Sequence, residues 1–124
     1  MVDALTTIHN VQVLVCAPEG PKLASETVAV DIIAEAFSEG ASMVLVPVER
    51  FDPAFFQLRS GLAGLIIQKF VNYKRQLVVL GDVSQYVTDS RAFHDFVYET
   101  NRGKQVWFLP DLAALNARLD LPIR

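Results

Sequence analysis

The sequence predicts an α/β fold with a mostly parallel sheet, an N-terminal antiparallel hairpin and the element order β-β-α-β-α-β-α-β-α. Apolar runs over residues 43–48, 77–80 and 106–109 are too short for helices and are typical of strands covered on both faces. Segments with helical spacing of apolar residues separate these runs. Strands that alternate with helices need crossover connections, which place them parallel in one sheet.

The first two strands are expected over residues 5–8 and 11–16, joined at His9 and Asn10. Asparagine tolerates the positive φ of a tight hairpin turn, which favours this pairing. A loop follows at residues 18–21, because proline and glycine interrupt regular structure there. A helix is expected next, since Gly40 supplies a C-terminal stop after a helical pattern formed by Val28, Ile32, Ile33, Ala36 and Phe37.

The middle of the chain begins with Asp52 and Pro53, a pair that suits the first turn of a helix. Phe55 and Phe56 are expected to anchor this short turn in the core. A longer helix is expected from Ser60 to about residue 74. It is apolar except for one narrow polar stripe, so we expect it to be buried on most sides. The stripe consists of Gly61, Gly64, Gln68, Asn72 and Arg75.

The last third of the chain is expected to add a helix, a strand and a final helix. Asp89 or Ser90 would cap the first of these helices, which carries Phe93, Phe96 and Val97 and ends at Gly103. Pro110 and Asp111 would open the final helix, with Leu112, Leu115 and Leu119 facing inward. No linker, repeat or low-complexity segment interrupts this order, so one domain over residues 1–124 is expected.

Composition narrows the classes of function. Apolar residues make up 52% of 124 residues, more than a soluble monomer of this size needs to bury. A partner is therefore expected to cover part of the surface, most simply a second copy in a homodimer. The net charge is -3 and the longest basic cluster is Lys74-Arg75, which disfavours binding to nucleic acid.

The sequence also predicts no metal, no cofactor and no membrane segment. Cys16 is the single cysteine, and neither His9 nor His94 has a second ligand at metal-binding spacing. A dyad of Cys16 and His9 is disfavoured, because nothing nearby in the sequence would activate the thiol. Residues 1–4 lack the features of a signal peptide, and no apolar run reaches the ~20 residues that span a bilayer. A cytoplasmic protein is expected.

Residues 58–63, at the start of the central helix, are Leu-Arg-Ser-Gly-Leu-Ala. Together with the element order, this motif resembles the STAS fold of anti-sigma-factor antagonists and of transporter cytoplasmic tails, whose domains start the helix after their third strand with Asp-Ser-Ser/Thr-Gly-Leu-Gly. Leu58 replaces the acidic residue and Arg59 replaces the serine that a kinase modifies, whereas Ser60 keeps the second hydroxyl. The resemblance therefore implies a regulatory scaffold that lacks the usual phosphoserine switch.

Four further segments form a second set of motifs: Phe55-Phe56-x-Leu58-Arg59-Ser60-Gly61-x-Ala63-Gly64, Gln68-Lys69-Phe70-x-Asn72-Tyr73, Gly81-Asp82 and Glu99-Thr100-Asn101-Arg102-Gly103. In this order they resemble, more closely than the STAS motif does, a small bacterial family described only as a domain of unknown function. This resemblance implies a compact single-domain bacterial protein and no particular activity.

The candidate ligand site is an anion site at Arg59, Ser60 and Gly61, where free helix N–H groups and a fixed positive charge would meet. Asp82 and Ser84 follow the next strand, at the end where parallel sheets place ligands, and Arg50 would lie at a neighbouring strand end. The simpler interpretation is that Ser60 only caps the helix and that Asp82 only caps a turn.

The candidate interface is the stripe of Gly64, Gln68 and Asn72, together with Tyr73. Its small residues would admit a partner helix, and its amides would bond across the contact. The other interpretation is an ordinary polar seam on a packed helix. Near the C-terminus, Glu99 would pair either locally or with a cation of the central helix, and Asn101 with Gly103 is an ordinary helix stop.

Three functions remain open from the sequence. The leading hypothesis is a non-enzymatic regulatory or scaffolding module that acts through protein-protein contacts. The second is a sensor that binds a small anion or nucleotide at the Ser60-Gly61 helix start. The third is a hydrolase or transferase that uses Asp82 and Arg59, and it is the weakest because the sequence contains no known catalytic motif.

Overall fold

Five strands lie side by side in chain order in the computed structural model, which describes residues 3–120. The first pair is antiparallel and every other neighbouring pair is parallel. The predicted α/β class and the predicted sheet are therefore confirmed. The strands are β1 (Ala4–Ile8), β2 (Val11–Val15), β3 (Met43–Pro47), β4 (Gln76–Leu80) and β5 (Val106–Leu109).

The β1–β2 hairpin closes with a two-residue turn, as predicted. His9 has a φ of 48° and Asn10 a φ of 68°, and Ile8 pairs with Val11 on either side of them. Two consecutive positive φ values are what the favoured two-residue hairpin turn requires, because its twist matches that of the strands. The histidine thus adopts the left-handed conformation together with the asparagine.

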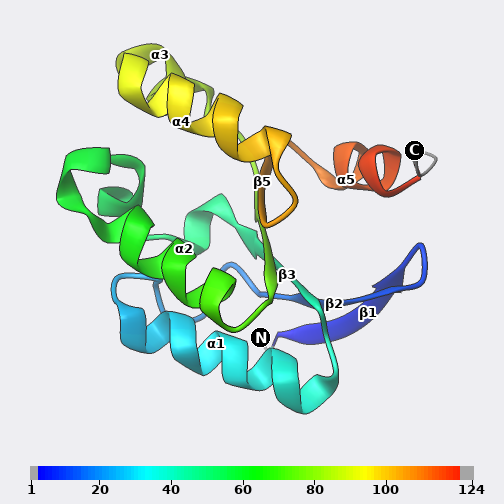
Figure 1. Cartoon of the computed structure of the whole chain (residues 1–124). Helices are drawn as coiled ribbons and strands as arrows, with labels where there is room; N and C mark the ends of the chain where they lie inside the picture. Colours follow the sequence, from blue (N-terminus) through cyan, green and yellow to red (C-terminus); the bar gives the residue numbers. More distant parts are fainter. Residues whose placement is uncertain (1–2, 121–124) are drawn as a thin grey trace.

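Three helices cover one face of the sheet (Figure 1): α1 (Glu26–Glu39), α2 (Leu62–Asn72) and α4 (Arg91–Arg102). Right-handed crossovers between strands that follow one another in chain order place their helices on the same face. Helix α5 (Leu112–Leu119) packs against the opposite face, where Leu115 joins Val13, Leu45 and Trp107. The sheet thus lies between the layer that contains α1, α2 and α4 on one face and α5 on the other.

Strand β3 shows why the central runs of the sequence are continuously apolar. Val44 and Val46 face the three-helix layer, whereas Met43 and Leu45 face the α5 side, and all four are buried. Alternate residues of a strand point to opposite faces, so a strand covered on both faces has no position left for a polar side chain.

The predicted caps are mostly confirmed. Gly40 ends α1 with a φ of 73°, and the carboxylate of Asp52 accepts a hydrogen bond from Ala54 N at 2.9 Å. Ser90, rather than Asp89, caps α4 by accepting from Phe93 N at 3.1 Å, and Asp111 caps α5.

The structure corrects four expectations about the helices. Helix α3 (Ser84–Asp89) was not predicted, because six residues are too few to show a period. Helix α2 begins at residue 62 rather than 60 and ends at residue 72, between positive-φ positions at Gly61 and Lys74. It buries only Ala63, Ile66 and Phe70, so it is an amphipathic surface helix and is not buried on most sides. Leu112 is half exposed rather than inward-facing.

Residues 1–2 and 121–124 lie outside the described residues. The predictions for residues 1–4 and for a domain over residues 1–124 therefore fall partly outside what the structure describes. Within residues 3–120, none of the helices is long and apolar enough to cross a membrane.

Candidate functional site

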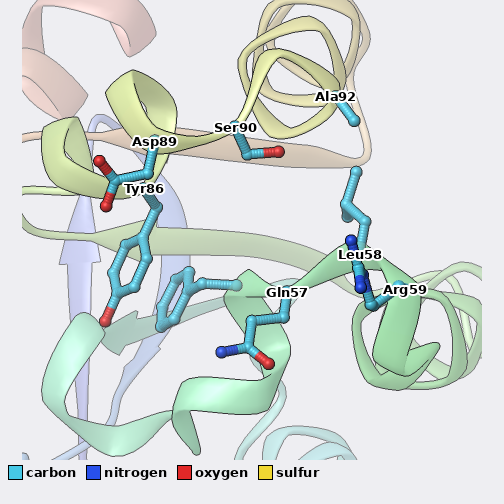
Figure 2. A pocket seen from close by; sticks show the side chains of 8 residues that line it. Gln57, Leu58, Arg59, Tyr86, Asp89, Ser90 and Ala92 are labelled. Carbon is cyan, nitrogen blue, oxygen red and sulfur yellow. The ribbon is translucent and has the colours of Figure 1, made fainter.

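Arg59 lines a cavity with a volume of about 680 Å³. The cavity lies between the short 3-10 segments that precede α2 and the junction of α3 with α4, as Figure 2 shows. These segments meet because Phe56 is buried and stacks on Tyr86, with ring centroids 4.4 Å apart and an angle of 11°. The cavity is lined by Phe56, Gln57, Leu58, Arg59, Tyr86, Asp89, Ser90 and Ala92.

The cavity has a positive side and a negative side. Arg59 is exposed, and no ion pair of its guanidinium occurs within residues 3–120. Asp89 lies on the other side of the cavity in Figure 2, near Tyr86, and accepts hydrogen bonds from the Gln85 side chain at 3.1 and 3.3 Å. A bound molecule would therefore meet a cation and a carboxylate at different ends.

The first turn of α4 adds to the positive side. Ser90 satisfies the amide of Phe93 with its hydroxyl and the amide of His94 with its carbonyl. The amides of residues 91 and 92 precede these and belong to the helix end that carries partial positive charge. Arg59 and this helix end are groups of the kind that small anions such as phosphate or carboxylate prefer.

Ser60 and Gly61 do not line this cavity. The Ser60 hydroxyl donates to Ala54 O at 2.6 Å and accepts from Leu62 N at 3.2 Å. Gly61 occupies the N-cap position of α2 with a φ of 79°, a conformation that favours glycine. Both residues thus have a structural role, namely to join the preceding 3-10 segment to α2.

Asp82 and Ser84 line a different cavity, of about 350 Å³, below the end of β4. The Asp82 carboxylate accepts from Ser84 N at 2.9 Å. The Ser84 hydroxyl, and after it the Ser84 amide, lower the pKa of Asp82 below its ordinary value. Asp82 therefore caps the turn that begins α3. The structure does not bring Asp82 and Arg59 into one crevice.

Arg50 lies in a third place, where it is 3% exposed. Its Nη1 donates to Asp3 Oδ1 at 3.1 Å and to Ala17 O at 2.8 Å, and its Nε donates to Pro21 O at 2.6 Å. The guanidinium fills the space beside Gly20, where a Cβ would overlap it. Arg50 therefore ties the chain before β1 and the loop after β2 to the end of β3.

Burial near Arg50 also raises the pKa values of two neighbouring side chains, Cys16 and Glu35. Burial, followed by the nearby Asp3 carboxylate, raises the pKa of Cys16 to about 12. The same two causes raise the pKa of Glu35. The thiol is thus protonated and enclosed at neutral pH, which is the state of an inert cysteine.

The predicted interface residues lie together on the exposed side of α2. Gly64, Gln68 and Asn72 follow one another along the helix, and Gln68 Nε2 donates to Asn72 Oδ1 at 2.8 Å. Leu65, Tyr73 and Phe37 flank them with 45–49% of each residue exposed. We call this surface the α1–α2 ridge; its residues are Phe37, Gly64, Leu65, Gln68, Asn72 and Tyr73.

The rest of the ridge is ordered by aromatic contacts. The rings of Phe37 and Tyr73 meet edge to face, with centroids 6.4 Å apart. The guanidinium of Arg75, the last residue of the predicted polar stripe, lies 3.7 Å from the centroid of Phe37. The exposed rings are therefore held in place from within the chain.

Other candidate residues have local roles. Asn101 Nδ2 donates to Phe108 O at 3.1 Å and Asn101 Oδ1 accepts from Phe108 N at 2.6 Å, so this side chain seals the outer edge of β5. The sequence predicts only a helix stop at Asn101, because its contact with β5 is a tertiary one. Glu99 pairs with Arg102 at 3.6 Å on its own helix. Across residues 3–120, no three His, Cys, Asp or Glu side chains are grouped so that they could hold a metal ion.

The fold and the site define a small α/β protein whose five strands follow the chain order and whose charged cavity lies beside helices α3 and α4. The chain belongs to the family described as a domain of unknown function (DUF4180), whose sequence model matches residues 8–119. The expected membership of such a family is thus confirmed. Comparison with curated proteins and comparison with solved structures give no match.

Proposed function

We propose that the protein is a non-enzymatic regulatory or scaffolding module that acts by binding other protein chains, and that the α1–α2 ridge is a contact surface. The observation that carries this proposal is Gly64. A Cβ at this position would meet no atom within 4 Å, and its φ is not in the left-handed region. Nothing within residues 3–120 therefore requires a glycine there.

A glycine inside a helix destabilises it by about 0.5–1 kcal/mol relative to alanine. A benefit outside the chain would offset this cost, and the close approach of a partner to the helix backbone is one such benefit. The neighbours of Gly64 support this explanation, because Leu65 and Tyr73 are large apolar side chains that remain about half exposed. Exposed apolar groups that lie together are typical of protein contact sites.

Site-specific photo-crosslinking in cells tests the ridge. A photoreactive phenylalanine analogue at position 73 should give a discrete crosslinked product, because Tyr73 belongs to the ridge. The matched control is position 98, where Tyr98 is also exposed but lies on α4. Equal crosslinking at the two positions, or none at either, would remove the ridge as a contact surface.

Gly64→Ala gives an independent measurement on the same surface. The substitution should stabilise the free protein by up to about 1 kcal/mol and lower the crosslinking yield at position 73. We therefore expect stability to rise while the crosslinking yield falls. A stabilised variant with an unchanged yield would show that the glycine does not serve the contact.

We also infer that the module is a homodimer, because its apolar content exceeds what one copy of this size needs to bury.

The motif around Ser60 supports a second part of the proposal, a STAS-like regulator without the phosphoserine switch. Arg59 stands at the usual phosphorylation position, and the Ser60 hydroxyl already bonds to Ala54 O and Leu62 N. Incubation with an anti-sigma-factor kinase and ATP should therefore leave the protein unmodified in mass spectrometry.

The cavity beside Arg59 favours a second candidate function, the binding of a small anion or nucleotide. A charge-assisted hydrogen bond contributes about 1.5–3 kcal/mol, so Arg59→Ala should weaken such binding about tenfold or more. Ser60→Ala is the matched control, since its hydroxyl lies outside the cavity lining. Calorimetry with phosphate, nucleotides and small carboxylates measures both variants. A wild-type protein that binds none of them below millimolar concentration would end this candidate.

A hydrolase or transferase that uses Asp82 and Arg59 gains no support, because the two side chains line different cavities. Asp82 Oδ1 instead accepts from Ser84 N in the turn that leads into α3.

A further inference from the structure

The two edges of the sheet differ in whether their outward backbone groups are hydrogen-bonded. At the β5 edge, the Asn101 side chain bonds both to the N–H and to the C=O of Phe108, so that it replaces a neighbouring strand. At the other edge, β1 is the outermost strand, and among the described strands it pairs with β2 alone. An uncovered edge is a template for pairing with another strand.

Strand β1 also lacks the features that normally prevent such pairing. Proteins protect exposed edges with lysine, proline, bulges or inward-pointing charges. Residues 4–8 read Ala-Leu-Thr-Thr-Ile, with no charge and no proline, and their register with β2 is continuous over all five positions. Leu5 is 42% exposed, so pairing at this edge would also cover apolar surface.

The hydrogen-bond pattern of the hairpin identifies which groups are free. In a hairpin with a two-residue turn, the residues that flank the turn form a hydrogen-bonded pair, and such pairs alternate along the strands. Ile8 flanks the turn, so residues 4, 6 and 8 direct their N–H and C=O groups toward β2. Leu5 and Thr7 therefore direct their backbone N–H and C=O groups away from β2, toward the open edge of the sheet. The Thr7 and Gln12 side chains meet at 3.1 Å, as expected for a pair without ladder bonds.

We propose that two copies of this chain pair through antiparallel β1 edges, with a two-fold axis at Thr6, to form one continuous ten-stranded sheet. Each Leu5 then faces Thr7 of the second copy, and the outward groups of both residues form four hydrogen bonds. Thr6 faces Thr6 of the second copy in a pair without ladder bonds, where side chains come closest. An isologous contact requires such a self-complementary surface, and β1 provides it without any change in conformation.

This inference rests on the homodimer part of the proposed function and does not involve the α1–α2 ridge, which stays free on both copies. The contact is small, since it involves five residues of each chain. Small interfaces are typical of weak and transient association, so the dimer is expected at micromolar concentration and above.

Cysteine crosslinking tests the register. Residues that face each other without ladder bonds have Cα atoms about 4.5 Å apart, which a disulfide can bridge. Thr6→Cys should therefore give a covalent dimer under mild oxidation. Leu5→Cys is the matched control, because two Leu5 residues would lie diagonally, about 7–8 Å apart. The native thiol contributes no background, since Cys16 is buried.

Sedimentation of the wild type and of Thr6→Lys completes the test. Like charges placed directly opposite destabilise strand pairing, so Thr6→Lys should weaken the dimer about fivefold or more. A wild-type dimer without a Thr6→Cys crosslink would overturn the β1 contact and leave the homodimer standing. A wild-type monomer at high micromolar concentration would overturn both, whereas the ridge is judged separately by crosslinking at position 73.

Discussion

Gly20 is present because the Arg50 guanidinium occupies the space where a side chain would be. A Cβ at position 20 would overlap Arg50 Cζ and both terminal nitrogens well inside van der Waals contact. The guanidinium is not free to move away, because three hydrogen bonds hold it to Asp3, Ala17 and Pro21. Gly20→Ala should therefore expel the guanidinium from its site and break these bonds.

The size of the effect follows from the burial of the ion pair. Arg50 and Asp3 have side chains that are 3% and 11% exposed. Removal of one partner from such a pair costs about 3–5 kcal/mol, which is the expected loss for Arg50→Ala. Unfolding entropy is about 2.1 cal/mol/K per residue, so the melting temperature of a 124-residue chain should fall by roughly 10–20 °C. Gly20→Ala should cost at least about 2 kcal/mol.

The two substitutions should not be additive. Once Arg50→Ala has removed the guanidinium, a methyl group at position 20 has nothing to displace. The double variant should therefore match Arg50→Ala alone within about 0.5 kcal/mol. Urea unfolding followed by circular dichroism measures all four members of the cycle.

Gly103→Ala is the control for a glycine without this constraint. Its Cβ would meet only Thr100 O, at an ordinary 3.5 Å, so a change of less than about 0.5 kcal/mol is expected. If the costs of Gly20→Ala and Arg50→Ala add in the double variant, or if Gly20→Ala is neutral, the assigned role of Arg50 is incorrect.

Three further predictions concern single groups. Cys16 should stay unreactive to thiol reagents at pH 8 in the folded protein and react on unfolding, since burial raises its pKa to about 12. The pKa of Asp82 is lowered, so its contribution to stability is present above the ordinary aspartate pKa and is lost as the pH falls through the folded value. Ser84→Ala should return this pKa toward its ordinary value, as NMR titration would show. Asn101→Ala should destabilise the fold by about 1–3 kcal/mol in urea unfolding, because Phe108 loses both backbone bonds.

Local signals in the sequence predicted most of the framework. Gly40, Asp52, Ser90 and Asp111 act at helix ends through their own backbone or through an amide within three residues. The strands are predictable because burial on both faces leaves only apolar residues in them. These features depend on neighbours in the chain, and neighbours are visible in a sequence.

The parts that were missed depend on contacts between distant residues. The bond from Arg50 to Asp3 joins positions 47 residues apart, and no local pattern distinguishes this arginine from a surface one. Arg59 was identified as a candidate anion-binding cation, but the helix end beside its cavity is that of α4 rather than that of α2. The stacking of Phe56 on Tyr86 decides this, and it is a tertiary contact.

The succession of strands in chain order has a consequence for synthesis. Because each strand pairs with the one made just before it, the ladder from β1 to β5 needs no segment to wait for a distant partner. Each of the three parallel pairings still closes a crossover connection that contains a helix, so the sheet grows by one strand at a time rather than all at once. A nascent chain that emerges N-terminus first can thus add one strand and one helix at a time. Until Asn101 and β5 have left the ribosome, the edge strand of the growing sheet is β4, and its outward backbone groups are unpaired. A pause in synthesis at that stage would favour pairing between the β4 edges of neighbouring nascent chains.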